Sequence, residues 1–386
     1  MKITAISPLL VNVSAKTNWF FLQVETDAGI QGLGEATLSG SWETVQLACL
    51  ERLRPHVVGK SPDVAVAALQ VYPHSPGGLA ANSIMSAVEI ALTDIRAREA
   101  GVPVHALFGQ PRNESMRIYA NVNRMTYDRS PAGFARSAQA KIAEGYTAVK
   151  MAPFDNVYYT DLEDGTVRAR LRLGIDCVLA VRDAIGPAVD LMIDCHWRFD
   201  EKTACEVLRE LEPAKLFWAE CMVSERAEHH AELARVRAFA RERGVRLAGA
   251  ERQVGAMGLE PIVRAGLLDV VMPDIKYSGG CREMQRIAER AAQGGIALSP
   301  HNPTGPVCTF ASLHMCSLAS NFLILEHQTE GTLYRDIINE PHPLPRDGAF
   351  PVPRGPGLGV TLNMDVVRER PYRTPTAEAL SDPRLS

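Results

Sequence analysis

The stretch Ile193-Asp194-Cys195-His196-Trp197-Arg198 ends an apolar run that begins near Val189. Successive side chains of a β-strand point to opposite faces, so Asp194, His196 and Arg198 are expected to point the same way. A carboxylate that can bind a metal would then stand beside an imidazole that can donate a proton. Taken alone the pattern is weak, because an Asp-x-His at a strand end is as often part of a surface loop.

Five more short apolar runs end in a polar side chain in the same way. The runs are Trp218-Ala219-Glu220, Leu247-Ala248-Gly249-Ala250-Glu251, Val270-Val271-Met272-Pro273-Asp274, Ala297-Leu298-Ser299-Pro300-His301 and Phe322-Leu323-Ile324-Leu325-Glu326. Each interval between successive members is about the length of one βα repeat. Polar groups that recur at this interval indicate neighbouring strands of one parallel sheet.

From about Arg117 the sequence alternates short β-rich runs with amphipathic segments of helix length. The strand candidates are 118–122, 148–151, 190–193, 216–219, 246–250, 270–272, 296–298 and 322–325. This alternation predicts parallel strands joined by right-handed crossovers, and eight such strands predict a closed α/β barrel. An open doubly wound sheet would also alternate, but it would not bring six consecutive strand ends around one point. In a barrel the chemistry gathers at the carboxyl ends of the strands, where the six polar groups fall.

The N-terminal part has a different pattern. It predicts an antiparallel meander followed by three helices, with strands at 3–13, 19–25 and 32–36 and helices at 42–56, 63–71 and 81–99. Gly32-Leu33-Gly34-Glu35 is too short and too badly placed for a phosphate-binding loop, and its glycines predict a bend near the end of a strand. We expect an α+β capping domain, a barrel, and a C-terminal segment that packs back on the cap, at residues 1–115, 116–330 and 331–386.

Charge and composition exclude several classes of function. The 386 residues carry a net charge of −4, which gives no reason to expect a nucleic-acid partner. No stretch approaches about 18 uninterrupted apolar residues, and the first residues lack the apolar core of a signal peptide. We expect a soluble cytoplasmic protein without a membrane partner, in which the eight cysteines are reduced core residues.

Three of the strand-end acids would form an oxygen-rich metal site. Asp194, Glu220 and Glu251 lie on adjacent predicted strands, without thiolates or paired histidines, so Mg²⁺ fits better than Zn²⁺. A cation with open positions could take both oxygens of a substrate carboxylate. It would then stabilise the enolate that forms when the α-proton leaves.

The other strand-end groups suggest proton transfer. Asp274 and His301 end consecutive strands, so the carboxylate can orient the imidazole, and His301 is the candidate base. Lys150 could offset charge on the substrate carboxylate from the opposite side of the mouth. Glu326 could share a proton with the second carboxylate oxygen, and His196 could protonate a departing hydroxyl.

Each of these residues also has an ordinary structural explanation. Asp274 could be a helix N-cap, Glu220 a first-turn acid, His301 a turn residue and Lys150 a strand-end lysine whose ammonium reaches solvent. As a set they would require six coincidences in register, which favours a functional site.

The residues resemble the enolase superfamily in its mandelate racemase-like branch, and within it the acid-sugar dehydratases typified by galactonate dehydratase. The resemblance covers nearly the whole chain. It is carried by Met1-Lys2-Ile3-Thr4, Glu25-Thr26-Asp27-Ala28-Gly29, Gly32-Leu33-Gly34-Glu35, Asp194-Cys195-His196-Trp197-Arg198, Ala250-Glu251-Arg252, Pro273-Asp274, Ser278-Gly279-Gly280, Pro300-His301-Asn302-Pro303-Thr304-Gly305-Pro306 and Pro356-Gly357-Leu358-Gly359-Val360.

The resemblance implies a (β/α)7β barrel under an α+β cap, with one Mg²⁺ per subunit on the three acids. It implies a lyase of carbohydrate-acid catabolism that eliminates water from a sugar acid, with His301 and Asp274 as base and His196 as acid. The product would be an enol that becomes a 2-keto-3-deoxy acid. Loops near 16–20 and 37–43 would close over the mouth, so Lys16 and Trp19 are expected to contact the substrate together with Arg198. The partner is thus a small carboxylate, and analogy with large barrels suggests a homo-oligomer.

Three features depart from the pattern of the family. Cys221-Met222 stands where many members carry a second acid or Gln and then Pro, and Ala152 stands where racemases carry a second lysine. Ala152 argues against a two-base racemase. The segment Pro153-Phe154-Asp155-Asn156-Val157-Tyr158-Tyr159 is longer and more aromatic than expected of galactonate dehydratase, which leaves the substrate open. The alternatives are a racemase or epimerase that uses His196 or Lys150, and a non-catalytic relative.

Overall fold

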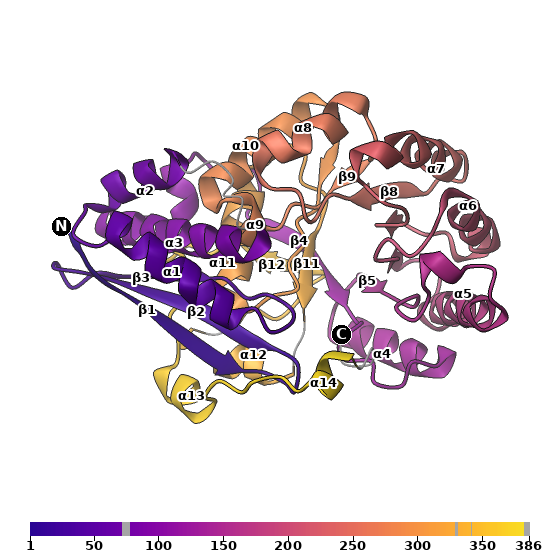
Figure 1. Cartoon of the computed structure of the whole chain (residues 1–386), viewed down its shortest axis with the longest axis horizontal. Coiled ribbons are helices and arrows are strands. Elements are labelled where there is room, and N and C mark those ends of the chain that lie inside the picture. The colour runs from indigo at the N-terminus through magenta and orange to yellow at the C-terminus, as the bar shows by residue number, and fades with distance from the viewer. Residues whose placement is uncertain (72–77, 329–330, 341, 382–386) are drawn as a thin grey trace.

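Eight parallel strands form the sheet at the centre of the larger part of the described chain (Figure 1). In this computed structural model, residues 1–71, 78–328, 331–340 and 342–381 are described. Residues 329–330, 341 and 382–386, which belong to the predicted barrel and C-terminal ranges, lie outside them. The strands are β4 (Ser115–Asn121), β5 (Ala148–Met151), β6 (Asp190–Asp194), β7 (Trp218–Glu220), β8 (Arg246–Gly249), β9 (Val270–Val271), β10 (Ala297–Leu298) and β11 (Leu325–Gln328).

The strands follow one another around a ring in sequence order. Each strand from β5 to β10 is hydrogen-bonded to its predecessor, and β11 pairs in parallel with β4. A parallel bridge between Leu298 and Phe322 joins β10 to the chain that leads into β11. The predicted barrel is therefore confirmed. The last strand starts three residues later than expected, so Glu326 lies inside β11 instead of following it.

Helices cover the outside of the ring and form an arc in Figure 1. They are α4 (Pro131–Ala143), α5 (Gly165–Ile185), α6 (Glu201–Glu210), α7 (His230–Glu242), α8 (Gly255–Ala265), α9 (Ile275–Ser278), α10 (Cys281–Gln293) and α11 (Pro306–Leu318). Ser130, Asp164 and Asp200 begin α4, α5 and α6 by accepting backbone N–H bonds, as N-cap residues do. No helix within the described ranges is both long and apolar enough to span a membrane.

The cap is a three-stranded antiparallel sheet covered by helices. Its elements are β1 (Ile3–Asn12), β2 (Asn18–Thr26), β3 (Gln31–Glu35), α1 (Glu43–Val57), α2 (Pro62–Val71) and α3 (Gly78–Glu99). We expected the two glycines of β3 to mark a bend, but they do not. They admit the backbone of α3, because a Cβ on Gly34 would lie 1.9 Å from the carbonyl oxygen of Ala87.

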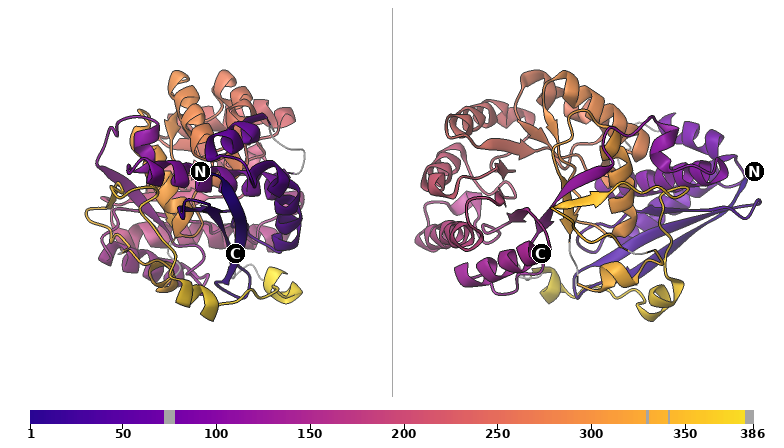
Figure 2. Two further views of the ribbon diagram at one scale, coloured as in Figure 1. Left: turned by 90° about the vertical axis from the view of Figure 1, so that its left-hand side faces the viewer. Right: turned by 180° about the vertical axis from the view of Figure 1, so that it is seen from behind.

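The C-terminal residues contact both the cap and the barrel (Figure 2). Their elements are α12 (Leu333–Asp336), β12 (Ala349–Pro351), α13 (Met364–Glu369) and α14 (Ala377–Ser381). On the cap side, the backbone N–H of Leu358 donates to Asp94 at 2.8 Å. On the barrel side, β12 pairs antiparallel with β4, a strand pair that the sequence pattern did not reveal.

A buried carboxylate ties the cap to the start of α11. Glu35, at the end of β3, accepts N–H bonds from Gly305 at 2.7 Å and Cys308 at 2.9 Å, and a hydroxyl bond from Thr304 at 2.5 Å. These donors lie directly after His301. The contact therefore fixes the loop after β10 against the cap through the N-terminus of a helix, where an anion is favoured.

A pair of buried histidines joins α11 to η1 (Val104–Leu107) and to the C-terminal residues. The Nδ1 atoms of His105 and His314 lie 2.9 Å apart, and Nε2 of His314 donates to the carbonyl of Leu358 at 3.1 Å. Nδ1 of His314 accepts the backbone N–H of His105 at 3.4 Å, so the ring has to be neutral. Burial lowers the pKa of His314 to about 3.

This pair predicts a specific pH dependence of stability. Because His314 has an unfolded pKa near 6.5, the unfolded chain takes up the proton first, and the stability present above that pH is lost as pH falls towards 3. Between pH 6.5 and 5, protonation of His314 in the unfolded chain lowers the free energy of unfolding by about 2 kcal/mol. His314→Gln, whose amide can still donate to Leu358, should flatten the pH dependence of urea unfolding, whereas His229→Gln should not. An unchanged pH dependence in His314→Gln would contradict this account.

Candidate active site

A cavity of about 600 Å³ opens at the carboxyl ends of the barrel strands, beneath the cap. Eight of the predicted site residues line it, namely Lys16, Lys150, Asp194, His196, Arg198, Glu251, His301 and Glu326. Glu220 and Asp274 are fully buried behind the wall and contact Lys150 and His301. The cavity and the residues behind its wall therefore bring together seven consecutive strands, β5 to β11.

Trp19 is not part of this cavity. It is 0% exposed, lies in β2, and packs edge-on against Tyr334 in an apolar cluster that the cap sheet forms with α11 and the C-terminal residues. The indole lies on an apolar side of the strand. Trp19 is therefore not among the substrate contacts that we propose. Lys16, from the turn before β2, does line the cavity.

The period of two residues in a strand separates the cavity from an apolar floor. Tyr119, Ala148, Met192, Trp218 and Ile324 form a buried cluster inside the barrel. The residues two positions further along the same strands are Asn121, Lys150, Asp194, Glu220 and Glu326. The floor thus supports a layer of polar side chains that face the mouth.

Lys150 lies at the centre of this polar layer. It is 1% exposed, and its Nζ lies 2.8 Å from Oε1 of Glu220 and 3.1 Å from Oε1 of Glu326. Burial alone would lower the pKa of Lys150, but the two carboxylates outweigh it and raise the pKa well above its usual value. Lys150 is therefore a fixed cation and a poor proton acceptor.

Glu326 is held as an anion. Its Oε1 accepts from Nδ2 of Asn121 at 2.7 Å, and its Oε2 accepts the backbone N–H of Asn302 at 2.8 Å. Burial opposes ionisation, but Lys150 and these donors lower the pKa of Glu326. If Glu326 shares a proton with a substrate carboxylate, that proton has to come from elsewhere.

Two of the three predicted metal ligands lie in a compact cluster. Among the described residues, one group of three brings its ligand atoms within 4.8 Å of one another: Asp194, Glu220 and Cys221. Glu251 lines the same cavity but is not in that group. Burial raises the pKa of the Cys221 thiol well above its usual value, so the thiol stays protonated and is a poor ligand.

Glu251 shows where a cation fits. Its Oε2 is buried and accepts no hydrogen bond from the described residues, although Nε2 of His301 lies 3.4 Å away. A buried carboxylate oxygen without a donor is costly unless a cation satisfies it. An all-oxygen donor set from Asp194, Glu220 and Glu251 suits a hard divalent cation.

The backbone is strained next to each of these acids. Positive φ values occur at His196 (45°), Trp197 (57°), Cys221 (49°) and Ala250 (74°), none of which is glycine. Left-handed backbone at residues with a Cβ costs free energy and clusters at functional sites. Here it turns the chain sharply as it leaves β6, β7 and β8.

His301 and Asp274 form the predicted pair. Nδ1 of His301 lies 2.8 Å from Oδ2 of Asp274, which also accepts from Nζ of Lys276 at 2.7 Å. Burial lowers the pKa of His301, but Glu251 and Asp274 outweigh it, so the pKa is raised. With Nδ1 bonded to Asp274, Nε2 is the nitrogen that can meet a substrate.

His196 belongs to a second pair that the sequence did not reveal. Nδ1 of His196 lies 2.6 Å from Oδ1 of Asp155, and its Nε2 lies 3.0 Å from Oδ2 of Asp194. Burial lowers the pKa of His196, but these carboxylates outweigh it and raise the pKa well above its usual value. His196 is thus held as an imidazolium that can donate a proton.

The two imidazoles come from opposite sides of the barrel. His196 follows β6 and His301 follows β10, and these strands lie four places apart in a ring of eight. The acidic cluster after β6, β7 and β8 lies between them in strand order. A substrate bound there would meet one imidazole from each side.

Sequence reasoning missed several contacts of this site. Asn121, Asp155, Lys276 and Asn302 each bond to a predicted catalytic residue. Asn121 ends the first barrel strand and would have extended the strand-end series. The other three lie in loops and on a short helix whose conformations no residue pattern fixes.

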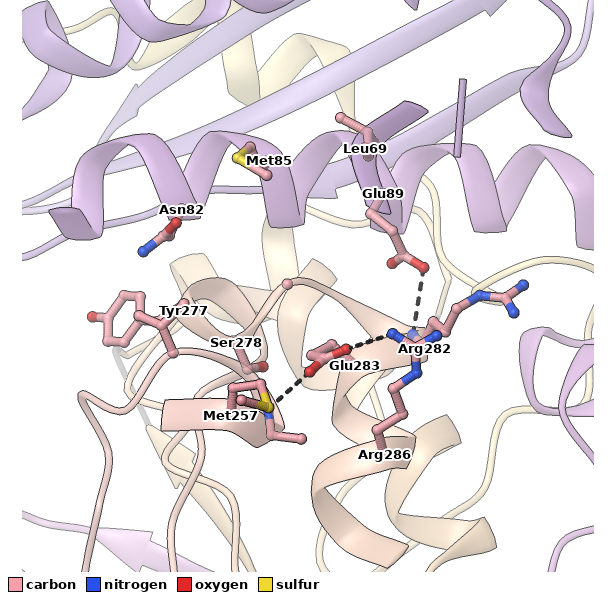
Figure 3. Close-up of a pocket in the computed structure, with 13 residues that line it drawn as sticks. Leu69, Asn82, Met85, Glu89, Met257, Tyr277, Ser278, Arg282, Glu283 and Arg286 are labelled. Carbon is pink, nitrogen blue, oxygen red and sulfur yellow. Dashed lines mark hydrogen bonds and ion pairs between the residues drawn. The ribbon is translucent and has the colours of Figure 1, made fainter. Parts of the chain in front are cut away.

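A second cavity, of about 380 Å³, lies between α3 of the cap and α9 and α10 of the barrel (Figure 3). It shares Tyr277 with the first cavity. Its two acids are satisfied by the protein itself. Glu89 accepts from the backbone N–H of Cys281, and Glu283 accepts from Arg286 and from the backbone of Ala256. We therefore place the chemistry in the larger cavity.

Comparisons with known proteins agree with this geometry. Curated D-galactonate dehydratases are similar over most of the chain. The protein of Verminephrobacter eiseniae is 30% identical over 96% of this chain and 94% of its own length, and that of Xanthomonas campestris is 31% identical over 95% and 94%. Among solved structures, a mandelate racemase/muconate lactonizing enzyme from Jannaschia sp. CCS1 gives a TM-score of 0.83 at 26% identity and covers 97% of this chain and 98% of its own.

A member of the enolase superfamily from Salmonella Typhimurium gives the same TM-score of 0.83, at 26% identity, and covers 96% of this chain and 98% of its own. Two family models match. The N-terminal domain of mandelate racemase / muconate lactonizing enzyme matches residues 4–109, and the enolase C-terminal domain-like family matches residues 133–366. The chain therefore belongs to the enolase superfamily, in the family of mandelate racemase and muconate lactonizing enzyme.

Proposed function

We propose that this protein is a Mg²⁺-dependent dehydratase of a sugar acid and produces a 2-keto-3-deoxy acid. The observation that carries the proposal is the pair of carboxylate-bound imidazoles, His196 and His301, on opposite sides of an acidic cluster. The similarity to D-galactonate dehydratases supports the same reaction class. We also expect a cytoplasmic homo-oligomer, because barrels of this size commonly associate.

Asp194, Glu220 and Glu251 are the residues that would hold Mg²⁺. Bound there, Mg²⁺ would stabilise the negative charge that develops on the substrate carboxylate as the α-proton leaves. Lys150 adds a fixed positive charge on the neighbouring strand, where it also offsets the charge of Glu220 and Glu326.

His301 would remove the α-proton through Nε2. Its Nδ1 hydrogen bond to Asp274 orients the ring, and the carboxylate stabilises the imidazolium that forms. Lys276 holds Asp274 in place and is itself 1% exposed. The electron pair of the broken C–H bond then lies on the carbon next to the carboxylate.

His196 would protonate the β-hydroxyl from the other side. The proton leaves Nε2, the C–O bond breaks, and its electron pair departs with the oxygen as water. The electron pair from the C–H bond becomes a C=C bond. The resulting enol tautomerises to the 2-keto-3-deoxy acid.

A racemase or epimerase is the second candidate. One observation favours it, since Asp155 makes His196 a second His–Asp pair of the kind a two-base mechanism needs. Against it, Ala152 is a buried alanine where racemases of the branch carry a lysine, and Lys150 is a poor base. A non-catalytic relative would have no need for two braced imidazoles and a buried carboxylate oxygen without a donor.

The entrance of the cavity favours a substrate with a second anionic group. Lys16, Arg124, Arg198 and Arg252 all line it. The guanidinium of Arg198 lies 5.6 Å above the ring of Tyr158, and its Nε is buried and donates to none of the described residues. An aldarate would place its second carboxylate among these cations, whereas an aldonate would place a hydroxyl there.

The metal site is tested by stability. Mg²⁺ should raise the thermal midpoint of the wild type, because a ligand that binds only the native state stabilises it by about 2.7 kcal/mol at a hundredfold excess over Kd. Glu251→Gln should weaken Mg²⁺ binding at least roughly tenfold in calorimetric titration. Glu228→Gln, an exposed acid on η4 (Ala227–His229), serves as the control. Full Mg²⁺ stabilisation in Glu251→Gln would remove Glu251 from the ligand set.

The reaction is tested with the two histidines. We expect the wild type to form 2-keto acids from a panel of sugar acids, detected with semicarbazide. His301→Asn should lose both this activity and exchange of the α-proton in D₂O, by about 10²- to 10⁴-fold. His196→Asn should keep exchange and lose elimination. Deuterium at the α-carbon with inversion, without any keto acid, would instead establish the epimerase, and His229→Asn controls for loss of a surface histidine.

The substrate class is tested with Arg198. We expect kcat/KM to be higher for aldarates than for aldonates of the same configuration. Arg198→Gln should lower kcat/KM for the aldarate by about 10- to 100-fold, the value of a hydrogen bond to a charged group, and leave the aldonate nearly unchanged. Equal losses for both substrates would show that Arg198 does not bind a second carboxylate.

A further inference from the structure

His196 is flanked by a carboxylate that belongs to the loop after β5. Oδ1 of Asp155 lies 2.6 Å from Nδ1 of His196, and the Asp155 side chain is 8% exposed. The two residues come from different strands of the barrel. Asp155 lies in the segment 153–159, which is longer and more aromatic than we expect of galactonate dehydratase.

Asp155 is itself held by the loop after β4. Its Oδ2 accepts from Nη2 of Arg129 at 3.0 Å and from Nδ2 of Asn123 at 3.3 Å. Arg129 also donates to the carbonyl of Ala152 at 2.6 Å and to Oδ1 of Asn123 at 2.6 Å. One oxygen of Asp155 is thus fixed by the protein, and the other is directed at His196.

The guanidinium and the loop are locked by packing. Arg129 lies 4.6 Å above the ring of Phe134. Phe154, next to Asp155, packs edge-on against Phe199 with ring centroids 5.1 Å apart. It also fills the space over Gly174 of α5, where a Cβ would lie 2.5 Å from its ring. Asp155 therefore has little freedom to leave His196.

This arrangement decides which nitrogen of His196 can react. A carboxylate accepts, so Nδ1 of His196 carries a hydrogen that it donates to Asp155. Nε2 then faces Asp194 and the cavity. When Nε2 gives its proton to the leaving oxygen and the C–O bond breaks, the ring becomes neutral. Its Nδ1 keeps a hydrogen, which it donates to Asp155.

We propose that Asp155, braced by Arg129 and Asn123, is a positioning residue that fixes the orientation and tautomer of His196 for proton transfer to the leaving group. The inference rests on the proposed function, because it assigns a partner to the acid of that reaction. It extends the chemistry to the loops after β4 and β5, which contribute no metal ligand. The loop after β5 thus supports the proposed acid, His196, which follows the neighbouring strand β6.

The first test separates the two halves of the reaction. Asp155→Asn, which keeps the shape of the side chain, should lower elimination by about 10- to 100-fold. It should leave α-proton exchange by His301 unchanged, which also shows that the variant is folded. Asp161→Asn, an exposed acid of the same connection, should match the wild type in both assays. Parallel loss of exchange and elimination in Asp155→Asn would overturn the positioning role.

A second substrate distinguishes positioning from a general structural effect. An analogue with fluorine in place of the β-hydroxyl loses fluoride without needing a proton. Asp155→Asn should therefore process this analogue at nearly the rate of the wild type, and Arg129→Lys should show the same pattern with a smaller defect on the hydroxy acid. A defect of equal size on both substrates would refute the proposal.

A third measurement does not depend on activity. In Mg²⁺-loaded protein labelled with ¹⁵N-histidine, the ring signals that disappear in His196→Asn should show hydrogen on Nδ1. Asp155→Asn should change the shifts of these signals, and Asp161→Asn should not. If wild type has no Nδ1 hydrogen at His196, the Asp155 proposal fails. If no sugar acid undergoes exchange or elimination but these signals behave as expected, the proposed function fails, and only the control of the His196 tautomer by Asp155 stands.

Discussion

The ammonium of Lys150, buried between Glu220 and Glu326, is the interaction on which the site depends. Several carboxylates face one barrel mouth, and such a set is stable only if each charge is compensated. Lys150 compensates Glu220 and Glu326, Lys276 compensates Asp274, and Arg129 compensates Asp155. Glu251 is the exception, since one of its buried oxygens accepts no hydrogen bond from the described residues. The deficit of positive charge therefore falls where a divalent cation would bind.

The barrel provides this network with a rigid base. Tyr119 and Trp218 meet edge-on beneath the mouth, with ring centroids 5.4 Å apart, and Nε1 of Trp218 donates to Oε2 of Glu220 at 3.2 Å. The same strand that buries the indole presents the carboxylate two residues later. Charge and core packing are thus set by one register, because a slip of one residue would turn both the floor and the polar layer to the outer face of the barrel.

The sequence was sufficient for the barrel, and for much of the site, because both follow from periodicity. Strand-end polar groups at the interval of a βα repeat had to converge, and the alternation of strands and helices left few other folds. The sequence did not predict the features that depend on loop conformation and long-range packing. The positive φ angles at His196 and Ala250 and the reach of Asp155 across to the next strand have no residue signature. The expectation that Trp19 contacts the substrate failed for a related reason. Neighbouring side chains of a strand face opposite ways, and the sequence of the loop does not determine which of them faces the cavity.

The two His–Asp pairs are chemically alike. The outcome of the reaction therefore depends on which group of the substrate lies next to each imidazole. Both rings have Nδ1 on a carboxylate that is itself held by a cation, Lys276 for Asp274 and Arg129 for Asp155. In the proposed reaction, His301 meets the α-carbon from one side of the barrel. If the group that faces His196 is a β-hydroxyl, an imidazolium there leads to loss of water. If it is the opposite face of the α-carbon, the same imidazolium returns a proton with inversion. If the proposed function holds, the position in which the cations at the entrance hold the far end of the substrate would decide between dehydration and epimerisation, more than the identity of the catalytic groups.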